Sequence, residues 1–185
     1  MTMLLTEDEI LGVPVGSTEP LFLTILAIHV VVALMAVVTG LIAMLSRKGS
    51  PRHTRGGRWY FYAICAVFAT ATGLAALRWS ETYYLFVIGA VAFTSSLIGV
   101  LHRKRHRPGD APHILGMGVS YIALLTGFYV DNGPNLPLWE LLPSWAFWVI
   151  PAAVGAPRIA ISTARWAGRR MKERINASAE NRGRE

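Results

Sequence analysis

Residues 21–46 read LFLTILAIHVVVALMAVVTGLIAMLS, a stretch with no Asp, Glu, Lys or Arg. A helix needs about 20 residues to span the hydrocarbon core of a membrane, with a working range of about 17 to 25. Four further runs, 59–78, 82–102, 113–130 and 141–157, have comparable lengths and carry no formal charge apart from Arg78 at the end of one run. The sequence therefore predicts an all-α integral membrane protein with five transmembrane helices.

Basic residues predict the orientation of these helices. They follow the first run at Arg47, Lys48, Arg52, Arg55 and Arg58, and the third run at Arg103, Lys104, Arg105 and Arg107. Because cytoplasmic loops carry an excess of Lys and Arg, we expect a multi-pass protein of the cell inner membrane, with a periplasmic or extracellular N-terminus and a cytoplasmic C-terminus.

The net charge of +7 does not indicate nucleic-acid binding, because the basic residues gather at the ends of membrane runs. There they favour membrane lipid as the partner. A homo-oligomer or a membrane-protein partner stays open.

The ends of the chain form two predicted segments outside the membrane domain of residues 21–157. Residues 1–20 form an outer segment, in which Thr6 and Glu9 match a capping box that predicts a short interfacial helix around Thr6–Leu11. The acidic start is not that of a signal peptide. Residues 158–185 form a basic amphipathic cytoplasmic tail with a disordered end.

Prolines set the fifth run apart from the other four. It begins at Pro143 and contains Pro151 and Pro157, so we expect a kinked or broken fifth helix.

Small residues at helical spacing predict how the first four helices meet. Lipid provides no hydrophobic drive between helices, so close packing of small residues supplies the attraction. We therefore expect a compact four-helix bundle with these faces inward. The small residues, taken run by run, are Ala33, Ala36, Gly40 and Ala43; Ala66, Ala69, Gly73 and Ala76; Ala92, Ser95 and Gly99; and Ser120 and Gly127. No internal repeat is clear enough to indicate an inverted-repeat transporter.

His29 is an ionisable residue in the outer half of the first run, on its small-residue face. Ionisable groups within a membrane indicate function, and here the candidates are a proton relay, a solute site or a metal ligand. The alternative is a neutral histidine that is hydrogen-bonded to a polar neighbour and holds helices together. The polar residues at comparable depth or farther out are Thr70, Tyr121, Thr126 and Asp131.

A second group of histidines lies at the cytoplasmic ends of the runs. His53, His102 and His113 are candidate ligands of a transition metal, and His102 with His113, beside Met117, are candidate axial ligands of haem b. Gly99 and Gly116 would leave room for a flat ring. The alternative is that these histidines, like His106, contact lipid phosphates.

Catalytic motifs of the familiar kinds are absent, since the sequence has no phosphate-binding glycine loop, no nucleophile elbow and no paired carboxylates within the runs. An enzyme with a soluble substrate is not expected. Three classes remain: a redox or metal-binding protein, a small transporter or sensor using His29 and Asp131, and a structural or assembly subunit.

Several motifs resemble an uncharacterised family of bacterial multi-pass membrane proteins. The resemblance covers His29, Gly40, Lys48, Gly49, His53 and Gly56, and later His113, Ile114, Met117, Gly118, Ser120, Tyr121, Ile122, Thr126, residues 129–134, Leu136, Pro137, Trp148, Pro151, Gly155 and Pro157. It implies a helical membrane fold and no particular activity.

A looser resemblance is to cytochrome b561-type haem bundles, which are small helical bundles with histidines on several helices. That resemblance implies two haems, each held by a histidine pair, at two depths. The sequence departs from it because His29 has no second histidine at its level. One inner haem, between His102 and His113 or with His53, is what the resemblance leaves.

Overall fold

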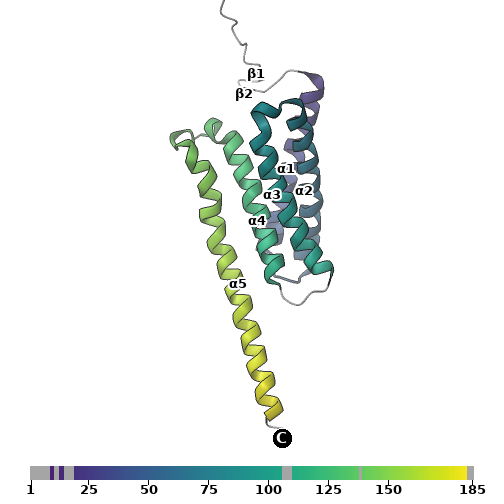
Figure 1. Ribbon diagram of the computed structural model, residues 1–185, viewed down its shortest axis with the longest axis vertical. Helices are drawn as coiled ribbons and strands as arrows, with labels where there is room; N and C mark the ends of the chain where they lie inside the picture. The colour runs from purple at the N-terminus through teal and green to yellow at the C-terminus, as the bar shows by residue number, and fades with distance from the viewer. Residues whose placement is uncertain (1–8, 11–12, 15–18, 106–109, 138, 183–185) are drawn as a thin grey trace, which may run out of the picture.

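A computed structural model of the protein describes residues 9–10, 13–14, 19–105, 110–137 and 139–182. Within them, the chain is dominated by five helices, α1 (Pro20–Leu45), α2 (Pro51–Leu77), α3 (Trp79–Lys104), α4 (Ala111–Asn132) and α5 (Ser144–Arg182) (Figure 1). Two short 3-10 helices, Gly133–Asn135 and Trp139–Leu141, connect α4 to α5. All five α-helices are long and apolar enough to cross a membrane, which confirms the predicted helical class.

Helix α2 begins well before its predicted start at residue 59. Ser50 caps it, accepting a hydrogen bond from the backbone N–H of His53 at 3.2 Å, and Pro51 occupies the first turn, where its missing N–H costs nothing. His53 and the arginines at 52, 55 and 58 therefore lie on the first two turns of a helix instead of in a loop.

Helix α5 runs unbroken through Pro151 and Pro157, so of the two expected forms, kinked or broken, the broken one is wrong. Each proline removes one intrahelical hydrogen bond, and the turns on both sides keep theirs. The helix also includes the basic residues assigned to a separate interfacial tail, and Figure 1 shows it continuing beyond the ends of the other four helices.

The N-terminal segment contains a two-stranded antiparallel sheet. Strand β1 (Glu9–Ile10) pairs with β2 (Val13–Pro14). The predicted helix is therefore wrong at Glu9 and Ile10, which lie in a strand. The other residues of the predicted helix, 6–8 and 11, lie outside the described residues.

The first four helices pack in chain order as two antiparallel hairpins, α1–α2 and α3–α4, which contact each other mainly through α2 and α3. The small-residue face predicted on α1 is confirmed, since Ala36, Gly40 and Ala43 are buried. On α2 the prediction is wrong, because Ala69 and Ala76 are exposed. The residues that α2 buries instead are Gly56, Tyr60, Ala63, Ile64, Val67, Leu74 and Ala75.

One glycine lets the two helices of each hairpin touch. A Cβ built on Gly56 would lie 3.2 Å from the carbonyl oxygen of Thr39 and from the backbone nitrogen of Ala43. A Cβ on Gly116 would lie 2.5 Å from the carbonyl oxygen of Ser95 and 2.9 Å from the backbone nitrogen of Gly99. At Gly116 only a residue without a side chain permits this approach, and at Gly56 a side chain would make the contact tight.

The two hairpins are copies of one unit. Gly56, Tyr60, Ala63 and Ile64 of α2 are buried, and so are the residues at the matching positions of α4, which are Gly116, Ser120, Ala123 and Leu124. Three of the four buried residues of α1, which are Ala36, Gly40 and Ala43, match Ala92, Ser96 and Gly99 of α3 at an interval of 56. Because α1 and α3 run in the same direction, this is a parallel repeat and not the inverted kind that the sequence analysis considered. It escaped notice in the sequence because matched positions carry different residue types.

Replacing Gly116 by alanine should destabilise the α3–α4 hairpin, because the new Cβ would meet backbone atoms that cannot rotate away. We expect a loss of about 1 to 3 kcal/mol, as for other overpacked cores, measured by thermal unfolding in detergent. Gly57→Ala is the matched control, because nothing lies within 4 Å of its Cβ and alanine favours helix. Equal melting temperatures for the two variants would contradict the proposed contact.

Candidate functional site: a histidine pair between the hairpins

Two histidines occupy the same position in the two hairpins, each on the first turn of its helix. The Nδ1 of His53 lies 2.8 Å from the carbonyl oxygen of Ala43, and the Nδ1 of His113 lies 3.1 Å from that of Gly99. A carbonyl oxygen can only accept, so both Nδ1 atoms carry the proton and donate it. Each neutral ring therefore keeps its Nε2 lone pair for another partner.

The two rings meet where the hairpins meet. Their centroids are 6.4 Å apart and their planes are nearly perpendicular, at 85°. Both rings are half-buried. A backbone carbonyl orients each imidazole, so the contact is held from both hairpins at once.

A buried hydrogen bond joins the hairpins about two turns further along the helices. The hydroxyls of Tyr60 and Ser120 are 2.7 Å apart, and the two residues are 60 positions apart in the chain, the same interval as His53 and His113. Tyr60 is 2% exposed and Ser120 is fully buried. The sequence analysis did not assign this pair, although the shared spacing of seven residues from each histidine could have revealed it.

Charged groups surround the histidine pair at the same end of the bundle. Arg103 of α3 forms an ion pair of 2.5 Å with Asp110, just before α4, and both act electrostatically on His113. In the turn between α1 and α2, burial lowers the pKa of Lys48, and the positive charge of Arg158 on α5 lowers it further. The environment of the pair is therefore basic, with one carboxylate already engaged.

The predicted set of His53, His102 and His113 does not come together. No group of three or more His, Cys, Asp or Glu side chains in the described part of the chain is arranged to hold a metal ion. His53 and His113 meet, and His106 lies outside the described residues. Metal binding stays a prediction.

The space expected for a haem between Gly99 and Gly116 is filled by protein. A Cβ on Gly116 would lie 3.0 Å from the Cα of Gly99, so the two backbones are in direct contact. Met117, the third candidate haem residue, packs its Cγ against Gly99. A haem ring does not fit between these helices in this arrangement.

The polar residues predicted to lie in the outer half make separate contacts. The Nδ1 of His29 is hydrogen-bonded to the hydroxyl of Thr70 at 2.8 Å, whereas Tyr121 donates to the carbonyl oxygen of Val37 at 3.2 Å and Thr126 to that of Ile122. Asp131 lies at the end of α4, in contact with Asn132. The bond between His29 and Thr70 holds α1 against α2, as expected of a histidine that joins helices.

The comparisons with known proteins match the first hairpin. Residues 20–78 match the model of a short repeat of unknown function, DUF308. The predicted resemblance to an uncharacterised family is confirmed over these residues, whereas the motifs from His113 to Pro157 lie outside the match. The matched segment is the α1–α2 hairpin, the unit that α3–α4 repeats in the structure. No curated protein and no solved structure matches the chain, so the resemblance to cytochrome b561 has no support there.

The bond between Tyr60 and Ser120 should stabilise the contact between the hairpins. Tyr60→Phe leaves a buried serine hydroxyl without this partner, at an expected cost of about 1 to 3 kcal/mol. Adding Ser120→Ala removes the orphaned group, so the double variant should recover part of the loss. A double-mutant cycle by thermal unfolding measures the coupling, and additive effects would contradict it.

Purified protein should show no Soret band, because the helix contact at Gly99 and Gly116 occupies the space of the ring. A visible absorption spectrum with elemental analysis on detergent-purified protein checks this. A Soret band that His113→Ala abolishes would overturn the helix packing described above.

Proposed function

We propose that this chain is a multi-pass protein of the cell inner membrane that responds to the proton concentration on the cytoplasmic side. The observation that carries the proposal is the contact between His53 and His113 across the two hairpins. Among common side chains, histidine changes charge between about pH 5 and 8 without special tuning.

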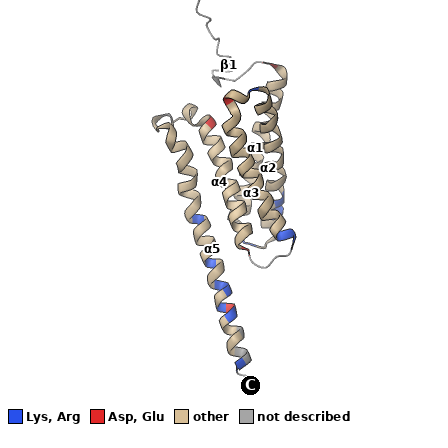
Figure 2. Ribbon diagram, viewed as in Figure 1, with Lys and Arg blue, Asp and Glu red and all other residues tan. Residues whose placement is uncertain are grey.

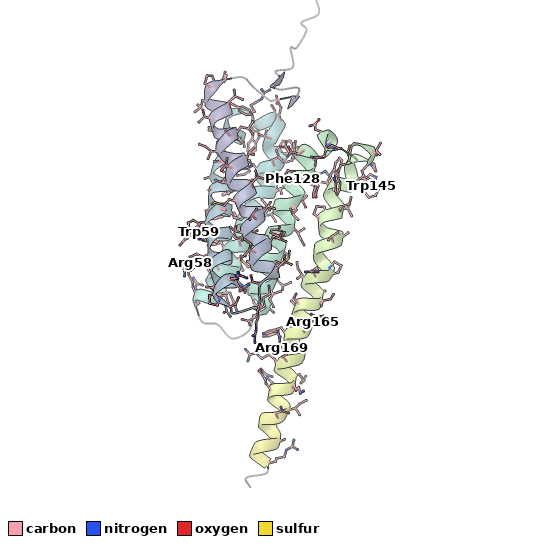
Figure 3. All side chains as sticks on the ribbon, turned by 180° about the vertical axis from the view of Figure 1, so that it is seen from behind. Arg58, Trp59, Phe128, Trp145, Arg165 and Arg169 are labelled. Atoms are coloured by element: carbon pink, nitrogen blue, oxygen red, sulfur yellow. The ribbon has the colours of Figure 1, made fainter. Side chains whose placement is uncertain are left out.

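The orientation, with the N-terminus outside and the C-terminus in the cytoplasm, is supported by the distribution of charge. Lys and Arg gather at one end of the bundle and along the lower half of α5, whereas Asp and Glu lie mainly at the other end (Figure 2). In Figure 3, Arg58, Arg165 and Arg169 lie toward the basic end, and Trp145 lies toward the other end. Arg78 is a basic residue at the opposite end, away from the other Lys and Arg residues of the bundle, and it forms an ion pair with Glu81 at 2.6 Å.

Protonation changes the sign of the interaction between the two rings. Neutral imidazoles in edge contact attract weakly, by about 0.5 to 1.5 kcal/mol for a typical ring pair. Two imidazolium ions with centroids 6.4 Å apart repel by about 2 to 3 kcal/mol at an effective dielectric constant of about 20. Arg103 adds repulsion that Asp110 largely offsets.

The repulsion acts on the weaker of the two kinds of helix contact. Within each hairpin, glycine brings backbones together, and both Nδ1 hydrogen bonds survive protonation because the imidazolium still donates. Between the hairpins near the pair, side chains make the contact, chiefly the two rings and the bond from Tyr60 to Ser120. Acidification therefore separates α2 from α4 at their cytoplasmic ends and leaves each hairpin intact.

Stability should rise with pH through the range in which histidine titrates. Two imidazolium ions repel across the closed contact and are free of that repulsion in the unfolded chain, so acid favours the unfolded state. We expect the wild type to lose about 2 to 3 kcal/mol more than His53→Gln between pH 8 and pH 5, measured by thermal unfolding in detergent. A pH profile of the wild type that matched that of His53→Gln would contradict the repulsion.

The opening itself can be measured as a distance. Spin labels at Arg52 and Leu115, both exposed, in a Cys65→Ala background should move apart between pH 8 and pH 5. His53→Gln should suppress that movement. An unchanged label distance, or the same change in His53→Gln, would sink the proposal.

A further inference from the structure

The outward faces of α2 and α4 occupy corresponding places in the two hairpins, but they differ in what packs against them. On α4 the face is covered by α5, in two reciprocal contacts. A Cβ on Gly118 would lie 2.6 Å from Ile159, and a Cβ on Gly155 of α5 would clash in the same way with Ile122. Glycine on each helix receives isoleucine from the other, so α5 fits closely on this face.

Among the helices that the structure describes, none covers the matching face of α2 in this way. At the interval that relates His53 to His113, Gly118 corresponds to Arg58 and Ile122 to Tyr62. Tyr62 is 56% exposed, and its neighbour Trp59, whose ring it meets edge to face, is 53% exposed. An arginine where α4 has a glycine prevents a helix from docking as α5 does. A ligand that binds this face therefore has to be compatible with the positive charge of Arg58.

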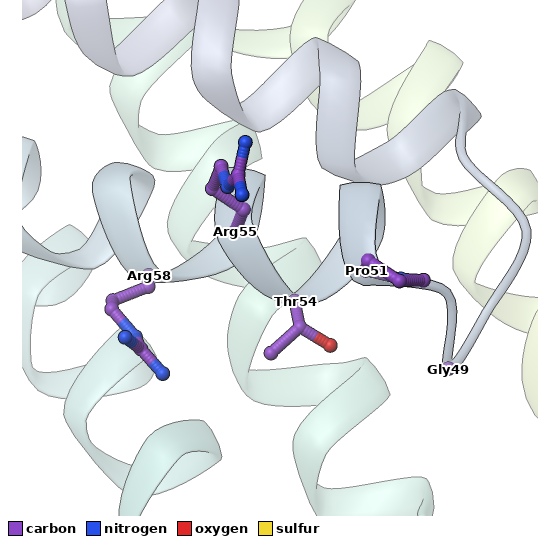
Figure 4. A pocket seen from close by; sticks show the side chains of 5 residues that line it. All are labelled: Gly49, Pro51, Thr54, Arg55 and Arg58. Carbon is purple, nitrogen blue, oxygen red and sulfur yellow. The ribbon is translucent and has the colours of Figure 1, made fainter.

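A hollow of about 400 Å³ opens on this face at the cytoplasmic end of α2. It is lined by Gly49, Pro51, Thr54, Arg55 and Arg58 (Figure 4). The figure shows the side chains of Arg55 and Arg58 extending to opposite sides of the helix. Both arginines nevertheless line the same hollow, so a ligand in it can contact each of them.

No carboxylate in the described part of the chain neutralises the positive charge of this hollow. Among the side chains that the structure describes, the ion pairs join Arg78 to Glu81 and Arg103 to Asp110, and neither Arg55 nor Arg58 has a carboxylate within ion-pair distance. The sequence from residue 47 to residue 58 contains no Asp or Glu. Guanidinium groups bind phosphate oxygens in a bidentate manner, so an anionic phosphate complements this site.

The aromatic residues next to the arginines identify the source of that phosphate. Trp and Tyr prefer the headgroup level of a membrane, where one end of the ring is apolar and the other is wet. Trp59 and Tyr62 lie directly beyond Arg58, toward the middle of the span. Charge followed by exposed aromatic surface matches a phospholipid, whose phosphate is followed by glycerol and acyl chains, better than it matches a free anion.

We propose that Arg55 and Arg58 bind the phosphate of an anionic phospholipid of the cytoplasmic leaflet, with its glycerol and acyl chains against Trp59 and Tyr62. A zwitterionic lipid is disfavoured because its ammonium group would lie beside two guanidinium groups. The site lies on the face of α2 opposite to His53, so it is independent of the histidine pair and shares with it only the orientation in the membrane.

The test compares lipid binding by matched arginine variants at pH 7.5. Detergent-purified full-length protein is titrated with phosphatidylglycerol, phosphatidylcholine or inorganic phosphate, and affinity is read from the thermal shift and from lipid retained in native mass spectrometry. Arg55→Gln/Arg58→Gln should bind phosphatidylglycerol about thirtyfold more weakly than wild type, since each of the two basic residues near a membrane surface contributes about 1 kcal/mol and about 1.4 kcal/mol is tenfold in affinity. Arg169→Gln/Arg174→Gln on α5 removes the same charge from exposed positions and should change affinity less than twofold.

Three further results would distinguish this site from general attraction between charges and from phosphate binding without lipid. An equal loss in both arginine variants would show general charge attraction and overturn the site. Binding of phosphatidylcholine as tight as that of phosphatidylglycerol, or an equal stabilisation by inorganic phosphate, would overturn the assignment to an anionic lipid. Arg55→Lys/Arg58→Lys keeps the charge and should recover most of the affinity, so a loss caused by misfolding of the glutamine variant is distinguished from a loss of binding.

Discussion

Contact between the backbones of paired helices is the constraint on which the rest of the structure depends. In a membrane the apolar side chains of one helix gain nothing by leaving lipid for another helix, so two helices stay together only where they approach closely. Gly56 provides that approach for α1 and α2, and Gly116 provides it for α3 and α4. Each glycine lies three residues after a histidine, and the close approach brings each histidine ring within reach of a carbonyl oxygen on the neighbouring helix.

The repeat turns that local geometry into a site. Because the hairpins are copies that face each other, residues at the same position of the copies meet, as His53 meets His113 and Tyr60 meets Ser120. Matched positions on the outward faces diverge instead, with Gly118 against α5 and Arg58 exposed to the surroundings. A symmetric interior and an asymmetric exterior thus follow from one duplicated unit plus a fifth helix that covers one copy.

The histidines illustrate how far sequence reasoning reached. It singled out His53 and His113 by residue type and depth but grouped them with His102, because a linear reading cannot tell which face of a helix a terminal residue occupies. It read Gly99 and Gly116 as space for a ring, whereas between helices a glycine more often permits contact than leaves a gap. Tyr60 is the second residue of a predicted run, and it is buried because the helix begins earlier than its hydrophobic run.

Composition by itself determined that this chain forms five helices able to span a membrane, because helix length and the absence of charge are local properties that the thickness of a bilayer imposes. It also separated a basic end from an acidic end. Only the tertiary structure decided which faces meet, that α5 continues through its prolines, and that two histidines 60 positions apart share one contact. These depend on the rotation of each helix about its axis, which many side chains set jointly and no single segment encodes.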